Sequence, residues 1–152
     1  MDEIDAKILD VVQTDGRTPL AQIGATVGLS TSAANERVKR LQADGLLTGI
    51  HGRVDPIKAG FGVCAIIEIL LGSPADDEPF IKGVLAEPQV LECHHITGDW
   101  SYLLKVRARS TDDLQHLLAD RIKGLPGVVR SRTSIALTSP KESTFLPCAP
   151  RG

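Results

Sequence analysis

The chain has 152 residues, which is the length of one average domain or two small ones. Its composition, 42% hydrophobic and 24% charged, is that of an ordinary soluble globular protein. No apolar run approaches the roughly 18 residues that span a bilayer, and the acidic start of the chain differs from the basic start of a signal peptide. Cys64, Cys93 and Cys148 are odd in number and widely spaced, which disfavours a disulfide scaffold. We therefore expect a cytoplasmic protein with no membrane partner.

The charge is unevenly distributed along the chain. The net charge is −2, which argues mildly against bulk electrostatic binding to nucleic acid. Residues 37–58, however, carry five basic side chains against two acidic ones. Such a segment is often only a solvated face, so the elements within it decide its meaning.

The first third of the sequence predicts three short helices. An apolar stripe from Ile4 to Val12 has helical spacing and ends at Asp15-Gly16. We expect Thr18 to cap a second helix that has Pro19 in its first position and stops at Gly28. Ser30 should cap a third helix over about residues 31–43. A helix, a tight glycine-containing turn and a second helix form a helix-turn-helix.

The third helix divides into two faces at 100° per residue. Ala34, Val38 and Leu41 should face the core. The opposite side carries Ser32, Asn35, Glu36 and Lys39, flanked by Arg37 and Arg40. A recognition helix has this division, with its first residues on base edges and its cations on phosphates. The same cations would also favour the C-terminal dipole of a merely solvated helix. The preceding helix and turn favour DNA.

A linker is predicted after this unit. Residues 46–55 resemble a short two-stranded wing, from which Arg53 would reach a phosphate, and Asp55-Pro56 and Gly60-Phe61-Gly62 mark a hinge. We expect a helix-turn-helix domain at 1–48, a hairpin and linker at 49–62, a second domain at 63–140 and a surface tail at 141–152.

The second domain reads as strand, helix, strand, strand, helix, strand. Apolar or alternating segments predict strands over 63–71, 90–97, 101–109 and 129–137. Helical faces around Phe80 and Leu117 lie between them. This order is the ferredoxin-like split unit, so the fold class is α+β. Each half is small for a self-sufficient core, and pairing of sheets between copies would bury what a monomer exposes. We expect a homo-oligomer.

At this point the sequence resembles the Lrp/AsnC (feast/famine) family of transcriptional regulators over about residues 2–139. The resemblance rests on the order and spacing of several short motifs. These are Asp5-Ala6-Lys7-Ile8-Leu9, Asp15-Gly16-Arg17, Val27-Gly28-Leu29-Ser30, Arg37-Val38-Lys39-Arg40-Leu41, Gly45-Leu46-Leu47, Val54-Asp55-Pro56 and Gly98-Asp99.

The resemblance implies a regulator of transcription that binds double-stranded operator DNA and whose assembly or DNA affinity responds to an amino acid or related metabolite. It implies dimers that often assemble into octamers, with the effector bound between dimers. The implied DNA contacts, together with the residue from the wing, are Ser30, Thr31, Ser32, Asn35, Arg37, Lys39, Arg40 and Arg53. The implied effector loop is Thr97, Gly98, Asp99, Trp100 and Ser101. Where the family often has a second Asp, this chain has Ser101.

Several alternatives remain open at this point. Gly98-Asp99-Trp100 is also an ordinary hairpin turn, and a lone Trp often packs at a subunit interface. A ligand-independent protein of the same fold would wrap DNA architecturally, and a thiol or metal sensor would use Cys64 and Cys93. On a strand, His94 and His95 point to opposite faces and do not chelate one ion together. Because the sequence lacks a phosphate-binding glycine loop, a nucleophile elbow and an HExxH pair, we expect no enzyme, cofactor or metal site.

Overall fold

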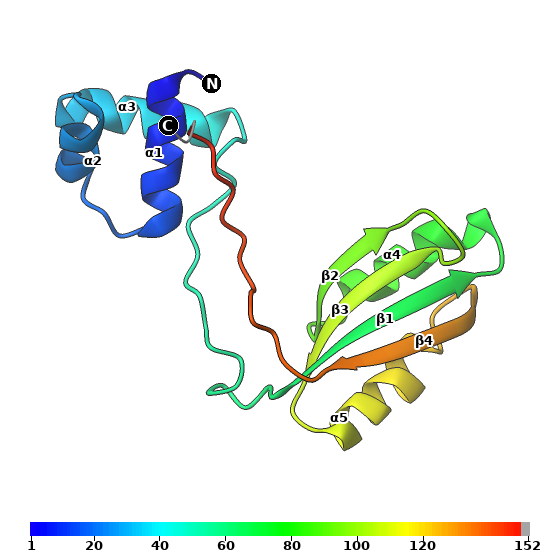
Figure 1. Cartoon of the computed structure of the whole chain (residues 1–152). Helices are drawn as coiled ribbons and strands as arrows, with labels where there is room; N and C mark the ends of the chain where they lie inside the picture. The colour runs from blue at the N-terminus through cyan, green and yellow to red at the C-terminus, as the bar shows by residue number, and fades with distance from the viewer. Residues whose placement is uncertain (150–152) are drawn as a thin grey trace. The chain divides into compact units, whose positions relative to one another are not determined.

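The structure, a computed structural model, describes residues 1–149 (Figure 1). The chain forms two units: residues 1–53 together with the segment that follows Pro140, and residues 54–140. The first unit contains α1 (Glu3–Thr14), α2 (Leu20–Val27) and α3 (Thr31–Ala43). The second contains β1 (Val63–Leu71), the 3₁₀ turn η1 (Pro74–Asp76), α4 (Asp77–Leu85), β2 (Val90–His95), β3 (Tyr102–Ala108), α5 (Thr111–His116), its π-helical continuation η2 (Leu117–Ile122) and β4 (Val128–Ala136).

The three predicted helices of the first unit are confirmed, with one difference at a cap. Ser30 caps α3, because its hydroxyl accepts a hydrogen bond from the Ala33 N–H at 3.2 Å. The predicted cap at Thr18 is wrong. Pro19 precedes α2 without any side-chain cap, and the Thr18 hydroxyl instead donates to the Asp15 carbonyl at 2.8 Å. The proline ring already fixes the backbone at the entry to α2, so the hydroxyl is free to close the preceding turn.

The turn between α2 and α3 depends on two glycines. Gly28 ends α2 with φ of 74°, in the left-handed region that favours glycine. Gly24 lies under the turn: a β-carbon built on it would lie 2.6 Å from the Leu29 carbonyl oxygen. The Leu29 N–H donates to the Gly24 carbonyl at 2.8 Å. The chain therefore passes α2 at a distance that excludes a side chain at Gly24, and this close approach fixes where α3 begins.

The aliphatic core of the first unit comes from all three helices and the segment after α3. Its buried residues include the predicted inward positions Ala34 and Leu41 of α3, with Val38 packed partly buried against them. The full buried set is Ile8, Leu9, Val12, Ile23, Ala34, Leu41 and Leu47. Since aromatic residues are absent from this set, the helices pack through aliphatic side chains alone.

The predicted two-stranded wing is wrong. Residues 46–55 contain no strand and run as an extended connection, with most of their side chains exposed. Gly49 and Gly52 cost backbone entropy in a strand, and an isolated hairpin without a packed face is at best marginally stable. The local sequence therefore does not hold a hairpin within this unit.

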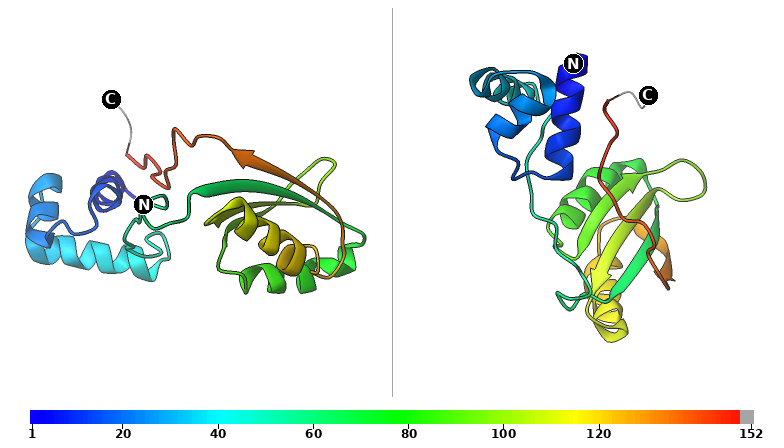
Figure 2. Two further views of the ribbon diagram at one scale, coloured as in Figure 1. Left: turned by 90° about the horizontal axis from the view of Figure 1, so that it is seen from below. Right: turned by 60° about the vertical axis from the view of Figure 1, so that its left-hand side comes forward.

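The second unit is a four-stranded antiparallel sheet in the order β2-β3-β1-β4, as the ferredoxin-like prediction requires. Both helices cover one face of it, which is clear in the left view of Figure 2. Alternate residues of the two central strands point into the helix-covered core. They are Ala65, Ile67, Ile69 and Leu71 of β1 and Tyr102, Leu104, Val106 and Ala108 of β3.

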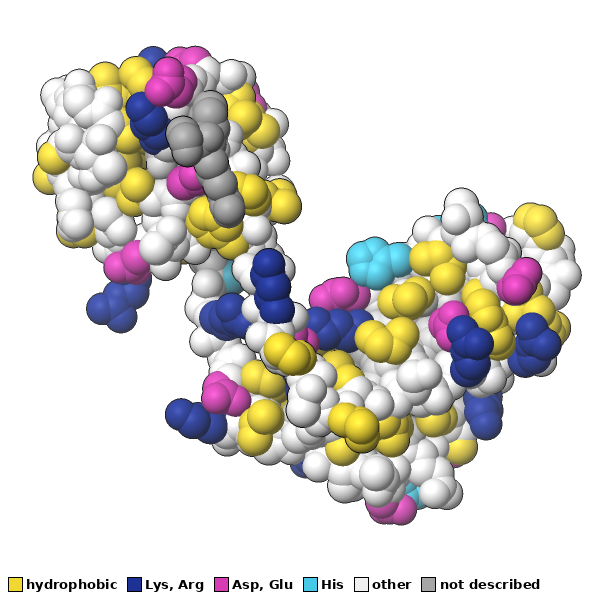
Figure 3. Space-filling model, in the orientation of Figure 1, with side chains coloured by type: hydrophobic (Ala, Val, Ile, Leu, Met, Phe, Trp, Pro, Cys, Tyr) yellow, Lys and Arg dark blue, Asp and Glu magenta, His cyan; other side chains and the backbone are white. Residues whose placement is uncertain are grey.

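No helix of the described residues covers the other face of the sheet. Its residues follow from the register: Ile66 pairs with Lys105 and Ser134, and Glu68 pairs with Leu103 and Arg132. Figure 3 shows this face of the unit, where hydrophobic side chains alternate with charged ones. Among residues 1–149, no helix is both long and apolar enough to cross a membrane.

Candidate nucleic-acid interface and effector loop

The N-terminal half of α3 presents short polar side chains to solvent. Thr31 and Ser32 are exposed, Asn35 is half-buried, and the Ser30 hydroxyl lies 3.1 Å from that of Ser32. Further along the helix, Lys39 is exposed and makes no ion pair among the described residues. This face offers hydroxyl and amide groups, then the exposed carboxylate of Glu36 and the cation of Lys39, in the order that the sequence predicts.

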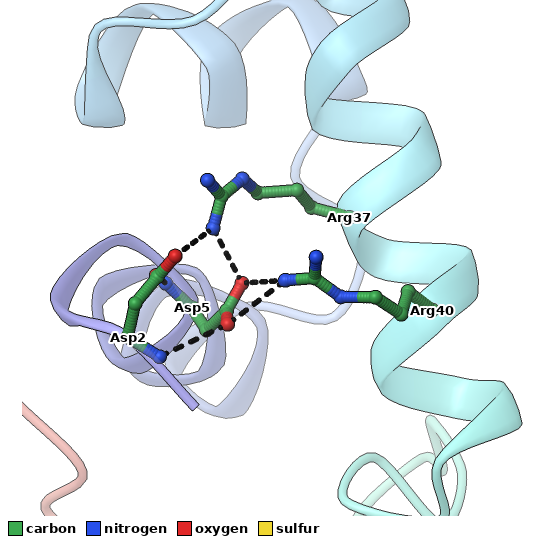
Figure 4. Close-up of polar contacts among 4 residues, drawn as sticks. All are labelled: Asp2, Asp5, Arg37 and Arg40. Carbon is green, nitrogen blue, oxygen red and sulfur yellow. Dashed lines mark hydrogen bonds and ion pairs between the residues drawn. The ribbon is translucent and has the colours of Figure 1, made fainter.

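Arg37 and Arg40 of α3 are turned toward α1 (Figure 4). The Asp5 carboxylate, which is almost fully buried, accepts hydrogen bonds from Arg37 Nη1 at 2.8 Å and from Arg40 Nη2 at 2.9 and 3.0 Å. Arg37 also pairs with Asp2. Because these four side chains join the start of α1 to the middle of α3, we call them the α1–α3 ion cluster.

The same two acids cap α1. Asp2 accepts a hydrogen bond from the Asp5 N–H at 2.8 Å, and the Asp2 N–H donates back to the Asp5 carboxylate at 3.1 Å. This is a capping box in which aspartate takes the place of the usual glutamate. Asp5 therefore satisfies the helix N-terminus and two guanidinium groups at once.

The α1–α3 ion cluster shifts the pKa values of Asp2, Asp5 and Arg37. Burial alone would raise the pKa of Asp5, but the Asp2 N–H, the hydrogen bond from Arg37 and the charge of Arg40 outweigh it and lower that pKa. The hydrogen bond from Arg37 is the main cause that lowers the pKa of Asp2 from 3.8 to about 2. Asp2 and Asp5 in turn raise the pKa of Arg37.

The depressed pKa of Asp2 predicts a loss of stability in acid. A carboxylate with a folded-state pKa below its ordinary value stabilises the fold above that value, 3.8 here, and the contribution is lost as the pH falls toward 2. We expect the free energy of unfolding of the first unit to fall between about pH 4 and pH 2. Urea unfolding followed by helical circular dichroism at each pH measures it. In Asp2→Asn, the free energy of unfolding should depend less on pH between about pH 4 and pH 2. An unchanged dependence in that variant would show that Asp2 does not cause the loss of stability.

Arg53 lies in the segment after α3 and contacts the C-terminal tail. Its guanidinium donates to the backbone carbonyl of Glu142. Of the eight predicted DNA contacts, five lie together along α3 or its cap and have no acidic partner in the described part of the chain, while Arg37, Arg40 and Arg53 are engaged within the unit. The predicted DNA contacts of these three arginines stay predictions.

The predicted effector loop joins β2 to β3. Gly98 has φ of 107°, which a residue with a β-carbon rarely adopts, and Thr97 and Asp99 are exposed. Ser101 ties the loop to β1: its N–H donates to the Ile69 carbonyl at 2.8 Å, and its hydroxyl accepts from the Leu71 N–H at 3.0 Å. The serine at this position therefore has a structural partner of its own.

Trp100 is half-buried beneath two arginines of β4. The guanidinium carbons of Arg130 and Arg132 lie 4.7 and 5.3 Å from its ring centroid. Arg132 also forms an ion pair with Glu68 of β1. Trp100 is the chain's only tryptophan. Its fluorescence emission should therefore respond to changes at the end of the sheet where the loop is held.

A shallow cavity of ≈ 300 Å³ opens beside the loop, between α4 and the ends of β2 and β3. His95 and Tyr102, the two residues that flank residues 96–101, line it and stack with ring centroids 4.8 Å apart. The Tyr102 hydroxyl donates to Asp77 at 3.1 Å. The remaining lining side chains are Ile81, Val84, Leu85 and Cys93. The cavity is mostly apolar, with one imidazole and one thiol at its wall.

The two cysteines of the sheet lie on opposite faces. Cys64 pairs in register with Arg107 and Ala136 on the face without helices, whereas Cys93 pairs with Leu104, a core residue. Burial raises the pKa of the Cys93 thiol. Among residues 1–149, no three His, Cys, Asp or Glu side chains form a group suited to a metal ion. A sensor that joins Cys64 and Cys93 within one subunit is therefore incompatible with this fold.

Sequence reasoning missed two parts of these sites. The signal for the α1–α3 ion cluster is present in the sequence, since acids three residues apart begin one helix and arginines three residues apart follow on another. No neighbouring residues reveal that these acids contact these arginines, because contacts between helices that are distant in sequence depend on how the helices pack. The cavity beside the loop combines residues from three elements, and its lining side chains read individually as ordinary core residues.

Two family models cover most of the chain. Residues 1–42 match the AsnC-type helix-turn-helix domain, and residues 64–146 match the Lrp/AsnC ligand binding domain. Among curated relatives, HTH-type transcriptional regulator FL11 of Pyrococcus horikoshii is 33% identical over 97% of this chain and 96% of its own length. The leucine-responsive regulatory protein of Haemophilus influenzae is 34% identical, over 96% of this chain and 89% of its own.

Solved structures give the same result. A transcriptional regulator of Neisseria meningitidis in complex with L-Met is 29% identical with a TM-score of 0.91, covering 97% of this chain and 96% of that one. AsnC of Escherichia coli is 30% identical with a TM-score of 0.88, covering 95% of this chain and 97% of that one. The family consists of regulators rather than enzymes. With its helix-turn-helix unit and ferredoxin-like ligand-binding unit, this chain belongs to the Lrp/AsnC family of DNA-binding transcriptional regulators.

Proposed function

We propose that the chain binds operator DNA sequence-specifically by placing α3 in the major groove. The observation that carries this proposal is the start of α3, where Thr31 and Ser32 are exposed and Asn35 is half-buried, and where none of the three has an acidic partner among residues 1–149. Side chains at the start of a recognition helix reach base edges, and a later cation meets phosphate. Lys39 supplies that cation.

Arg37 and Arg40 have a different first role in this proposal. Both are bound to the Asp5 carboxylate, so they fix the angle between α3 and α1. A helix that enters the groove at a fixed angle loses less entropy on binding than a mobile one. The arginines thus act on DNA recognition by positioning α3.

A homodimer is the assembly that suits this unit. Two recognition helices related by a two-fold axis reach half-sites about one helical turn apart. The helix-free face of the sheet, on which Ile66, Leu70 and Leu103 are half-buried, is suited to a second copy of the chain. Assembly of such dimers into octamers, and action on DNA in the cytoplasm, complete the proposal.

Substitution of two α3 residues tests DNA recognition. Asn35→Ala should reduce discrimination between the operator and random DNA by about 1–3 kcal/mol, because a base contact is lost. Lys39→Ala should weaken binding to all sequences alike. It should also reduce the salt slope, the steepness with which the logarithm of the binding constant falls with the logarithm of the salt concentration, by about 1. Binding isotherms at several salt concentrations, on duplexes recovered by selection with the wild-type chain, measure both.

Lys7→Ala is the matched control, because Lys7 is a cation on α1 that pairs with Glu3. It should leave affinity and salt slope unchanged. Equal losses on operator and random DNA for Asn35→Ala would remove this residue from base readout.

We propose further that the effector is an amino acid with an apolar side chain, bound at residues 97–101. The exposed carboxylate of Asp99 suits an ammonium group, and the adjoining cavity is lined largely by aliphatic side chains. A cavity of this size and polarity favours an aliphatic or thioether chain over an amide. The named response of one relative to leucine and the L-Met complex of another agree with this class.

The effector proposal is tested by titration with each of the twenty amino acids, following Trp100 emission and sedimentation together. An effector shifts assembly only if it binds two assemblies with different affinity. We expect a saturable response to aliphatic amino acids or methionine, weakened by Asp99→Ala and by Leu85→Ala. Leu91→Ala, an exposed β2 residue that does not line the cavity, is the control. Silence in both signals with DNA binding intact would favour a ligand-independent architectural protein instead.

A further inference from the structure

The segment after β4 returns to the first helix of the chain. The side-chain amide of Gln13 pairs with the backbone of Leu146 in both directions: Gln13 Nε2 donates to the Leu146 carbonyl at 2.9 Å, and the Leu146 N–H donates to Gln13 Oε1 at 2.8 Å. This reciprocal pair resembles one rung of an antiparallel strand pair, with a side-chain amide in place of a peptide group.

One turn earlier on α1, Asp10 holds the next part of the segment. Its two carboxylate oxygens accept from the Cys148 N–H at 2.9 Å and from the Ala149 N–H at 3.3 Å. The half-buried Cys148 packs against the aliphatic core of the first unit. All four of these hydrogen bonds go to the backbone of the segment, so the Asp10–Gln13 surface recognises an extended peptide chiefly through its main chain.

The docked segment changes how the two units are connected. The first unit contains residues from both ends of the chain, and the sheet unit lies between them in sequence. The chain therefore passes from one unit to the other twice, at residues 53–54 and at 140–141. While the segment is docked both passages act as tethers, and when it is released only the first one does.

We propose that Asp10 and Gln13 form a peptide-docking site for the C-terminal segment of the same chain, and that the docked segment is a second tether for the DNA-binding unit. Two tethers leave the unit fewer orientations than one. Fewer free orientations lower the entropy lost when two recognition helices engage DNA together. This second consequence rests on the proposed binding of two half-sites, whereas the docking itself does not.

Thiol labelling of the full-length chain tests the docking. Release of the segment exposes Cys148, so its labelling rate, measured by mass spectrometry, follows the undocked fraction. Removing two hydrogen-bond acceptors with Asp10→Ala should raise that rate roughly tenfold, and Gln13→Ala should raise it by a similar factor. Cys93, in the sheet unit, is the internal reference.

Glu3→Ala is the matched control variant. Glu3 is also an acid of α1, but it pairs with Lys7 and makes no described contact with the segment. Its Cys148 labelling rate should equal that of the wild-type chain. An unchanged rate in both Asp10→Ala and Gln13→Ala would overturn the docking site. A wild-type rate that falls as protein concentration rises would assign the docked segment to a second copy and overturn the tether within one chain.

DNA binding tests the tether separately. On duplexes recovered by selection with the wild-type chain, Asp10→Ala should weaken binding to two half-sites by roughly threefold to tenfold and leave binding to a single half-site unchanged. Faster labelling of Cys148 with no change on two half-sites would overturn the tether. If the wild-type chain itself selected no sequence, the proposed operator binding would fail, while the labelling result would still decide the docking site.

Discussion

Replacing Asp5 with alanine should unfold the DNA-binding unit at a temperature where the sheet unit stays folded. Breaking a buried ion pair costs about 3–5 kcal/mol, and here the same change removes half of a capping box. The two arginines are partly exposed and can turn to water, which places the expected loss near the lower limit, about 3 kcal/mol. For a unit of this size that loss lowers the melting temperature by roughly 10–20 °C.

Two readouts separate the units in this experiment. Trp100 emission reports the sheet unit, and hydrogen exchange of peptides from α1 and α3 reports the DNA-binding unit. Asp5→Asn keeps the shape and a carbonyl acceptor for the cap, so it should cost less than Asp5→Ala and separate the charge from the cap. Equal stability of Asp5→Ala and the wild-type chain would show that the α1–α3 ion cluster contributes nothing to the fold.

The second large effect is expected in the sheet unit. Phe80 of α4 is fully buried, and its ring lies 4.9 Å from that of Tyr102 between the helix and the sheet. Phe80→Ala should reduce the free energy of unfolding by about 3–5 kcal/mol, because transfer and cavity terms add. The unfolding transition seen through Trp100 should move to lower denaturant, and α1 and α3 should keep their protection from exchange.

Leu85→Ala provides the matched control for this substitution. Leu85 lies on the same helix but is 79% exposed, so its loss should change stability by about 0.5 kcal/mol at most. Leu85 also lines the cavity beside the predicted effector loop, so Leu85→Ala should weaken the proposed effector binding while the fold stays intact. If Phe80→Ala destabilised both units equally, the two units would instead unfold as one cooperative system.

Local chemistry explains why most of the architecture follows from the sequence. Gly28 and Ser30 mark the turn and the cap of α3 because each has a backbone or hydrogen-bonding property that few residues share. The alternation from Tyr102 to Ala108 identifies a half-buried strand because side-chain direction reverses at each residue. These signals lie within a few residues of the feature that they predict.

Features that depend on distant partners could not be predicted in this way. Arg37 and Arg40 read as cations for phosphate, because nothing near them in sequence reveals the Asp5 carboxylate on another helix. The expected wing failed for the opposite reason: residues 46–55 have turn-forming glycines but no partner surface that would pair them. The tail lacks any regular pattern, and its hydrogen bonds with Asp10 and Gln13 run chiefly through backbone N–H and carbonyl groups, which almost all residue types share.

The docked tail also has a consequence for the order in which the protein is made. A ribosome releases α1 well before the segment around Cys148, although the two belong to one unit. The three helices can therefore assemble early, while the surface of α1 at Asp10 and Gln13 stays uncovered until the sheet unit has been made. The DNA-binding unit is completed only after the sheet unit has been made, so a chain that stopped before residue 141 would carry α3 while Asp10 and Gln13 of α1 lacked these contacts.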